Sequence, residues 1–181
     1  LKGMKVRAPT RQTNRFLGAL GATPVAMPVP QVGEALSKGV IDGAVIPYEV
    51  VPSVKVQEIT KFHSETDPAL PAFYTSTFIF AMNKAKYDAL PPDLKKVIDA
   101  NSGQSLSGDI GRAFVEADVI GKKTIAANTI NVIPKEELEN WVKVGQPLAD
   151  AWVADVSAKG ANGKQLYDGA KALISKHSTG R

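Results

Sequence analysis

The chain has 181 residues, of which 44% are hydrophobic and 22% charged, and its formal net charge is +4. This composition is typical of a globular domain with a hydrophobic core. The absence of cysteine excludes disulfides, thiolate metal sites and cysteine nucleophiles from this chain. Its basic residues are scattered rather than interleaved with aromatics along a stripe, so we expect no nucleic-acid partner.

The first quarter of the sequence alternates between strand and helix patterns. Gly21 and Gly39 each follow an amphipathic stretch and are typical helix-stop signals. The expected elements are a strand over 4–8, a helix over 14–20, a strand over 22–29, a helix over 30–39 and a strand over 40–47. Because the connections are short, this alternation predicts an α/β fold with a largely parallel sheet.

The rest of the chain begins with a predicted helix after Pro47 and a proline-broken, polar loop over 61–74. The stretch "FYTSTFIFAMN" (73–83) is uncharged and rich in aromatic and β-branched residues, which predicts a strand buried on both faces. Helical spacing then predicts one long helix from about 92 to 128, bent at its Gly- and Ser-rich part. The remaining elements are a strand over 130–134, a helix after Pro134, and helices over 148–159 and 163–177.

Motifs for catalysis are missing from the sequence. His63 and His177 are the two histidines, and neither lies in an acid–nucleophile pattern. Neither a nucleophile elbow nor a phosphate or dinucleotide loop is present. "HSETD" (63–67) is more typical of a solvated loop than of a metal site. We therefore expect no catalytic residues, no metal and no cofactor.

Arg7 is the strongest candidate for a binding residue, since it ends the first strand. In an open α/β sheet the crevice beyond the carboxyl ends of the strands is where ligands bind. An arginine there can hold a carboxylate through two parallel hydrogen bonds. The alternative is a surface salt bridge to a local acid. Thr10 and Asn14 follow, and they either cap the helix, which is the simpler interpretation, or contact a ligand.

Two further pairs of residues lie where a ligand could reach them. Tyr48 and Glu49 stand just past the third strand, again on the carboxyl edge of the predicted sheet. Phe73 and Tyr74 open the predicted strand over 73–83. Each of these aromatic residues could equally belong to the core.

Three stretches of the sequence carry a family resemblance. "LKGMKVRAP", "LGATPVAMPVPQVGEALSKGVIDGAVIP" and "MNKAKYDALPPDLKKVIDAN" resemble the solute receptors of TRAP transporters, the tripartite ATP-independent periplasmic family, which is DctP-like. The motifs occur in the family's order with near-normal spacing. They cover the chain from Leu1 to about Asn128, and the C-terminal helices are compatible.

The resemblance implies a periplasmic-binding-protein-like fold of two α/β lobes, hinged around a cleft and joined by one long helix. It implies a receptor that captures a small organic acid in the periplasm and presents it to the membrane permease subunits, with Arg7 as the carboxylate-binding residue. The chain is then expected to begin at the second lobe and to lack most of the first. Residues 1–72 would form the second-lobe core, 73–112 the segment that returns to the first lobe, and 113–181 the rest of the long helix with the C-terminal strand and helices.

One departure from the family pattern concerns the ligand. Many members read D-G-Q-E-N-P where this chain reads "DGAVIP", so Ile46 replaces an amide that reaches the ligand. An apolar wall at this place argues against a sugar acid. With Tyr48, Phe73 and Tyr74 nearby, the expected ligand is a carboxylate with an apolar or aromatic body, such as an aryl or branched-chain acid.

Two other functions stay open from the sequence. One is a ligand-sensing module that passes its ligand state to another protein, and the other is an enzyme on the same scaffold, since a fold does not determine a function. Without a first lobe, the segment 78–82 and the long helix would expose apolar surface. We therefore expect the chain either to pair with another copy, by exchanging segments, or to be a breakdown product.

Overall fold

A computed structural model describes residues 1–67, 69–70 and 72–178, and the chain folds as two units. The first unit contains residues 1–46, 59–74 and 128–181, and the second contains 47–58 and 75–127. The chain therefore passes between the units at four places, after Ile46, Glu58, Tyr74 and Ala127.

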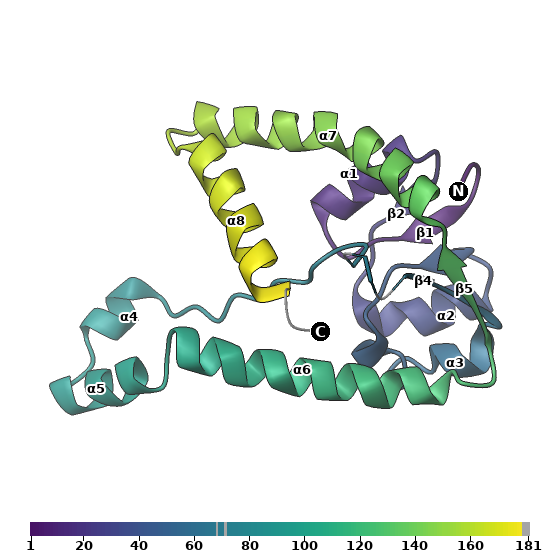
Figure 1. The fold of residues 1–181 in the computed structure, drawn as a ribbon. Coiled ribbons are helices and arrows are strands. Elements are labelled where there is room, and N and C mark those ends of the chain that lie inside the picture. Colours follow the sequence, from purple (N-terminus) through teal and green to yellow (C-terminus); the bar gives the residue numbers. More distant parts are fainter. Residues whose placement is uncertain (68, 71, 179–181) are drawn as a thin grey trace. The chain divides into compact units, whose positions relative to one another are not determined.

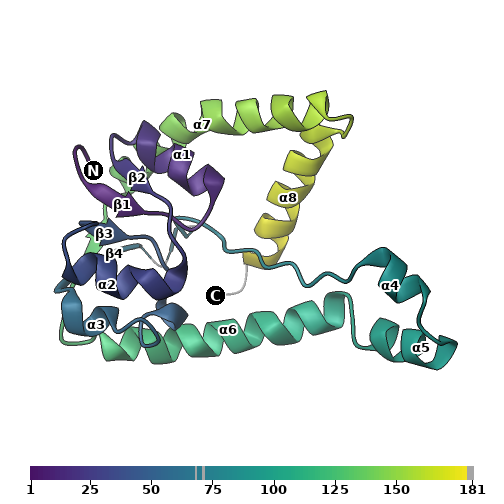
Figure 2. The same cartoon turned by 180° about the vertical axis from the view of Figure 1, so that it is seen from behind.

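A three-stranded parallel sheet forms the start of the first unit (Figures 1 and 2). Its strands are β1 (Lys5–Arg7), β2 (Thr23–Val25) and β3 (Gly43–Ala44), in the order β2-β1-β3. The register places Val6 of the central strand opposite Pro24 and Gly43. Helix α1 (Arg11–Ala19) connects β1 to β2, while the 3-10 helix η1 (Val29–Gln31) and α2 (Val32–Ser37) connect β2 to β3. The predicted α/β alternation with a parallel sheet is confirmed, although each strand is shorter than expected.

The core of this sheet is small and made of aliphatic side chains. Val6, Ala8, Leu17 and Ala22 are buried together, and Val45 and Phe73 pack against them. The chain turns from α1 into β2 at Gly21, whose φ of +86° lies in the left-handed region that glycine adopts without steric cost. This turn brings Ala22 under the helix and positions β2 beside β1.

A second sheet of the same unit pairs two distant segments. Strand β4 (Phe62–Thr66) lies parallel to β5 (Thr129–Ile133), with His63 opposite Ile130. The prediction of a loop over 61–74 is therefore wrong for residues 62–66. Because most side chains of β4 are polar, its sequence lacks the apolar–polar alternation expected of a half-buried strand. It is a strand because it pairs with β5, which lies more than sixty positions later in the chain.

Helices α7 (Lys135–Ala158) and α8 (Gly163–Ser178) complete the first unit and meet at the turn after Ala158 (Figure 1). The separate helix predicted over 148–159 is wrong, because α7 continues through Pro147. Helix α7 packs against α1 at Gly145, where a β-carbon would lie 3.2 Å from the ring of Phe16. The absence of a side chain on Gly145 allows this close approach.

The second unit is mainly helical. It holds the 3-10 helix η2 (Tyr48–Val50), the start of α3 (Val56–Ile59), α4 (Lys84–Asp88), α5 (Pro92–Ala100) and α6 (Gln104–Thr124). The helix predicted after Pro47 is realised only as the short η2 and α3. The single helix predicted from 92 to 128 is also wrong, since a turn at 101–103 separates α5 from α6. Gly103, with φ at +81°, makes this turn a break rather than a bend.

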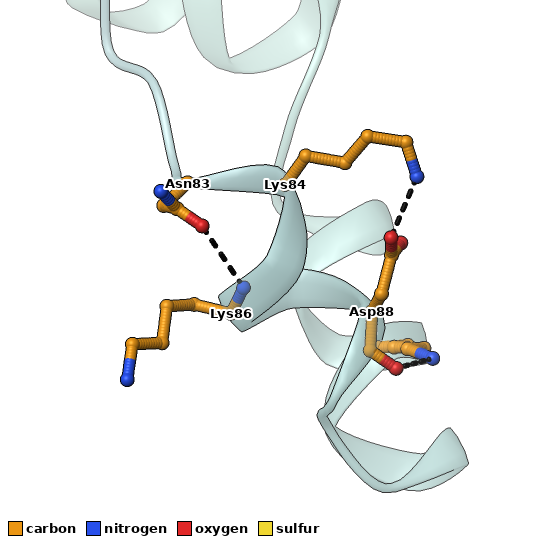
Figure 3. A network of polar contacts seen from close by, with 5 residues as sticks. Asn83, Lys84, Lys86 and Asp88 are labelled. Carbon is orange, nitrogen blue, oxygen red and sulfur yellow. Dashed lines mark hydrogen bonds and ion pairs between the residues drawn. The ribbon is translucent and has the colours of Figure 1, made fainter.

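Surface polar contacts hold α4 and its junction with α5 (Figure 3). The Asn83 side-chain oxygen accepts a hydrogen bond from the Lys86 backbone N–H at 3.2 Å, which caps the start of α4. Lys84 pairs with the Asp88 carboxylate at 2.7 Å, and Lys95 of α5 donates to the Asp88 backbone carbonyl at 2.7 Å. These contacts fix the corner between two helices that have no buried residues.

The segment after Tyr74 contradicts the strongest strand prediction. Residues 75–83 form neither helix nor strand, and Ile79 and Phe80 are 90% and 100% exposed. Phe78 stacks on Phe114 of α6, with ring centroids 5.1 Å apart. A strand requires a ladder partner, and no strand of the described residues pairs with this segment. Its composition favours a strand, but composition alone cannot supply the partner.

Candidate functional site

Arg7 ends the central strand β1 and is almost fully buried, with 5% of the residue exposed. Its Nε donates a hydrogen bond to the backbone carbonyl of Met27 at 3.2 Å, and its Nη1 donates to the carbonyl of Val45 at 3.1 Å. Met27 follows β2 and Val45 follows β3. Because all three strands are parallel, their carboxyl ends meet at one edge, and these two carbonyls hold the guanidinium there.

The charge of Arg7 is not neutralised by a carboxylate of the described residues, since no ion pair of Arg7 occurs among them. Burial lowers the pKa of Arg7 from its ordinary value, and the nearby Tyr74 opposes this shift. An arginine still stays protonated at physiological pH. A guanidinium has five N–H donors, and the Met27 and Val45 carbonyls accept from two of them, which leaves three for other partners. A surface salt bridge, the alternative reading of Arg7, is therefore wrong.

An open depression of about 600 Å³ lies at the same sheet edge. Its walls come from two segments, the β1–α1 connection and the residues after β2. The lining residues are Ala8, Pro9, Thr10, Arg11, Asn14, Ala26, Met27 and Pro28. Most of them are apolar. Arg7 is not a lining residue, and its link to the depression is the hydrogen bond to the Met27 carbonyl. Walls of this kind suit the apolar part of a small molecule.

Thr10 and Asn14 both line this depression, and the side chains of both make hydrogen bonds at the start of α1. The Thr10 hydroxyl accepts a hydrogen bond from the Thr13 backbone N–H at 3.1 Å, and the Thr13 hydroxyl lies 2.6 Å from it. The Asn14 side-chain amide donates to the Thr10 carbonyl at 2.7 Å. The capping interpretation is confirmed for Thr10, whose hydroxyl satisfies a first-turn N–H.

Arg11 is a lining residue that the sequence reasoning missed. It is exposed at the first position of α1, a helix with no acidic residue in its first turn. A cation at the start of a helix opposes the helix dipole, so this placement is unfavourable for the helix itself. That local mismatch was the available signal.

Ile46, Phe73 and Tyr74 complete the candidate residues of the first unit. Ile46 follows Val45 directly and is half-buried. Phe73 packs against the rings of Phe16 and Trp141, with centroid distances of 5.5 and 5.4 Å. These contacts give Phe73 a place in the core. The ring of Tyr74 meets Phe73 edge-on at 6.2 Å and is close enough to Arg7 to affect its pKa.

Tyr48 and Glu49 belong to the second unit, where η2 contacts α6. The Glu49 backbone N–H donates to the Asp118 carboxylate at 2.8 Å, and Lys122 lies over the Tyr48 ring at 5.7 Å. Burial raises the pKa of the Glu49 carboxyl, and the negative charge of the nearby Asp118 raises it further. Within this unit both residues therefore take part in packing η2 on the helix.

The described residues contain neither a metal-binding cluster nor a membrane-spanning helix. Across residues 1–67, 69–70 and 72–178, no group of three or more His, Asp or Glu side chains could hold a metal ion. No helix in the same ranges has both the length and the apolar character to cross a membrane.

Comparison with known families gives one match over most of the chain. Residues 1–155 match the family model DctP, described as bacterial extracellular solute-binding protein, family 7. Among curated proteins, the 2,3-diketo-L-gulonate-binding periplasmic protein YiaO of Escherichia coli is 29% identical over 161 residues, which are 86% of this chain and 46% of that protein. The C4-dicarboxylate-binding periplasmic protein DctP of Rhodobacter capsulatus is 23% identical over 87% of this chain and 46% of that protein. The chain thus spans about half the length of these relatives.

Solved structures show the same fold at higher identity. A TRAP solute-binding protein from Rhodoferax ferrireducens, in complex with copurified benzoate, is 54% identical with a TM-score of 0.90 over 98% of this chain and 56% of that one. A marine metagenome TRAP solute-binding protein specific for aromatic acid ligands, in complex with metahydroxyphenylacetate, is 43% identical with a TM-score of 0.88 over 97% of this chain and 56% of that one. The predicted periplasmic-binding-protein-like fold is therefore confirmed.

Proposed function

Because the chain belongs to family 7 of the bacterial extracellular solute-binding proteins, we propose that it acts in a periplasmic receptor for a small organic carboxylate. The receptor serves a TRAP-type secondary transporter and hands the solute to its membrane permease subunits, without catalysing a reaction. The observation that carries the proposal is the guanidinium of Arg7, which is buried at the sheet edge and held by two backbone carbonyls. A buried cation that is held in place but not neutralised is suited to bind an anion from solution.

Arg7 binds the carboxylate of the solute in this proposal. Hydrogen bonds to charged groups contribute about 1.5–3 kcal/mol, which is more than an exposed ion pair contributes. The two carbonyl bonds fix the guanidinium plane before the solute arrives, so little side-chain entropy is lost on binding. The first unit thus supplies a preorganised anion site.

The body of the solute is apolar or aromatic in this proposal. Ile46 stands next to the Val45 carbonyl that holds Arg7, and the depression is lined mainly by alanine, proline and methionine. Such walls bind a ring or branched chain and leave sugar hydroxyls without partners. The benzoate and metahydroxyphenylacetate in the two similar structures also support an aryl acid.

The neighbouring candidates have secondary roles in this proposal. Thr10 and Asn14 shape the polar wall of the depression, and Tyr74 lies beside the arginine. Phe73 acts through the core, where it supports Tyr74. Tyr48 and Glu49 remain predicted contacts.

A thermal-shift screen with matched ligands tests the proposal on the protein that carries this sequence. Benzoate and 3-hydroxybenzoate should raise the unfolding temperature, and native mass spectrometry should detect an aryl acid retained through purification. Benzamide, which keeps the ring and loses the charge, is the matched control and should give no shift. Equal stabilisation by benzamide would contradict carboxylate recognition, and stabilisation by galacturonate but not benzoate would contradict the apolar body.

A further inference from the structure

The chain passes between the two units at four places, and at two of these it enters the first unit through neighbouring segments. The chain returns to this unit after Glu58 and again after Ala127, and the two segments soon become β4 and β5. The Thr129 backbone N–H donates to the Lys61 carbonyl at 2.9 Å, just ahead of the paired strands. The two segments by which the chain re-enters the first unit are therefore hydrogen-bonded to each other at the start of this sheet, which we call its entrance.

Three polar side chains bridge this entrance. The Asn128 Nδ2 donates to the Thr60 backbone carbonyl at 2.8 Å and lies 3.0 Å from the His63 Nε2, and the Thr60 hydroxyl lies 3.3 Å from the same nitrogen. A carbonyl oxygen can only accept, so the Asn128 amide must turn its NH₂ group toward Thr60. The second N–H of that group then donates to the His63 Nε2.

This geometry determines the state of the histidine. Since Nε2 accepts a hydrogen bond, the His63 ring is neutral and carries its proton on Nδ1. Protonation would place an N–H on Nε2 against the N–H of Asn128, and the contact would become repulsive. Lys61 and Glu65 are the ionisable residues two positions away on the same segment, and β5 (Thr129–Ile133) has no titratable side chain. Burial lowers the pKa of His63, which favours the neutral ring.

We propose that Thr60, His63 and Asn128 form a pH-sensitive clasp that joins these two segments while His63 is neutral and loosens when His63 is protonated. The folded clasp binds protons more weakly than the free side chain does, so its contribution to stability is full above the ordinary histidine value of 6.5. The contribution is lost as the pH falls below 6.5 toward the lowered pKa of the folded state. The clasp does not depend on the solute or on Arg7, so it goes beyond the proposed receptor function.

Nuclear magnetic resonance of the protein without added solute tests the clasp directly. Long-range proton–nitrogen spectra should show the Nδ1-protonated tautomer of His63 at pH 7.5 and a titration midpoint below 6.5. His177, exposed near the end of α8, provides an internal reference signal. A proton on Nε2 of His63, or a midpoint at or above 6.5, would overturn the proposal.

Hydrogen exchange of the Thr129 amide gives the second readout, after correction for the intrinsic pH dependence of exchange. Its protection should fall below pH 6.5 by up to about tenfold per pH unit, because one pKa unit corresponds to a factor of ten. In His63→Gln, which keeps an acceptor but does not titrate, protection should not change over this range. In Asn128→Ala, the His63 midpoint should move toward 6.5. Protection that varies equally with pH in the wild type and in His63→Gln would contradict the clasp. If a variant fails to fold, the tautomer and the titration midpoint of His63 in the wild type still test the proposal.

Discussion

Tyr48 and Gly121 lie so close together that the carbonyl oxygen of Tyr48 fills the space that a β-carbon on residue 121 would need. Gly121 is the buried residue of α6, and the backbone of η2 rests directly on it. A glycine here is required by the approach of another backbone rather than by its own conformation.

Gly121→Ala should therefore destabilise the second unit by about 1–3 kcal/mol, the usual cost of forcing extra atoms into a packed site. Gly111→Ala in the same helix is the matched control, because its β-carbon would meet nothing within 4 Å. Alanine there should stabilise α6 by up to about 1 kcal/mol through helix propensity. Urea unfolding of the two variants measures both effects, and equal stabilities would contradict the packing of η2 on α6.

Arg7→Ala should weaken benzoate binding about tenfold or more, since the buried charge-assisted hydrogen bonds are lost. Arg7→Lys keeps the charge but loses the forked geometry, and should fall between the wild type and the alanine variant. Isothermal titration calorimetry gives the three affinities, with circular dichroism to confirm folding.

Arg15→Ala is the matched control for the arginine series. Arg15 lies on α1 in an exposed ion pair with Asp155 at 3.7 Å, so its removal should leave the affinity within about twofold. An unchanged affinity in Arg7→Ala would remove Arg7 from the site.

Thr10→Ala should lower the free energy of unfolding by about 1 kcal/mol, because the Thr13 N–H loses its capping acceptor. Thr10→Ser keeps the oxygen and should stay close to the wild type. Thermal unfolding distinguishes the variants. If the free energy of benzoate binding falls by more than the free energy of unfolding in both variants, the methyl group of Thr10 contacts the solute.

Glu49→Gln should stabilise the protein at neutral pH relative to the wild type. The raised pKa means that Glu49 binds its proton more tightly in the folded state, so its favourable contribution is full below the ordinary value of 4.5. That contribution is lost as the pH rises through the raised value. Denaturation from pH 4 to pH 8 should show a gain for Glu49→Gln that grows with pH, and a gain that stays constant over this range would contradict the raised pKa.

Local signals predicted the β1–α1–β2 part of the fold well. The alternation over 4–8, the cap at Thr10 and the glycine stop at Gly21 all act within a few residues, and the structure contains each of them. Strand β4 was missed because its partner is remote in sequence, and the strand predicted over 73–83 failed because it has no partner among the described residues. Strand formation depends on pairing, which a single segment does not encode.

The candidate site was partly predictable for the same reason. The position of Arg7 at the end of a strand follows from the alternating pattern, and its burial agrees with that position. The bond from Glu49 to Asp118 joins residues 69 positions apart, so no local pattern could indicate it. The exposed Arg11 was overlooked, although a cation at the first position of a helix is unfavourable for the helix dipole and was a local signal in the sequence.

Pro147 interrupts the backbone hydrogen bonding of α7, although the helix is continuous. Proline has no backbone N–H, so the carbonyl of Lys143, one turn earlier, lacks its helical donor. The half before this point is anchored to α1 through Gly145, while the half after it leads into α8. Asp155, beyond Pro147, also pairs with Arg15 of α1 at 3.7 Å, so we expect a local kink at Pro147 in a helix that contacts α1 on both sides of it.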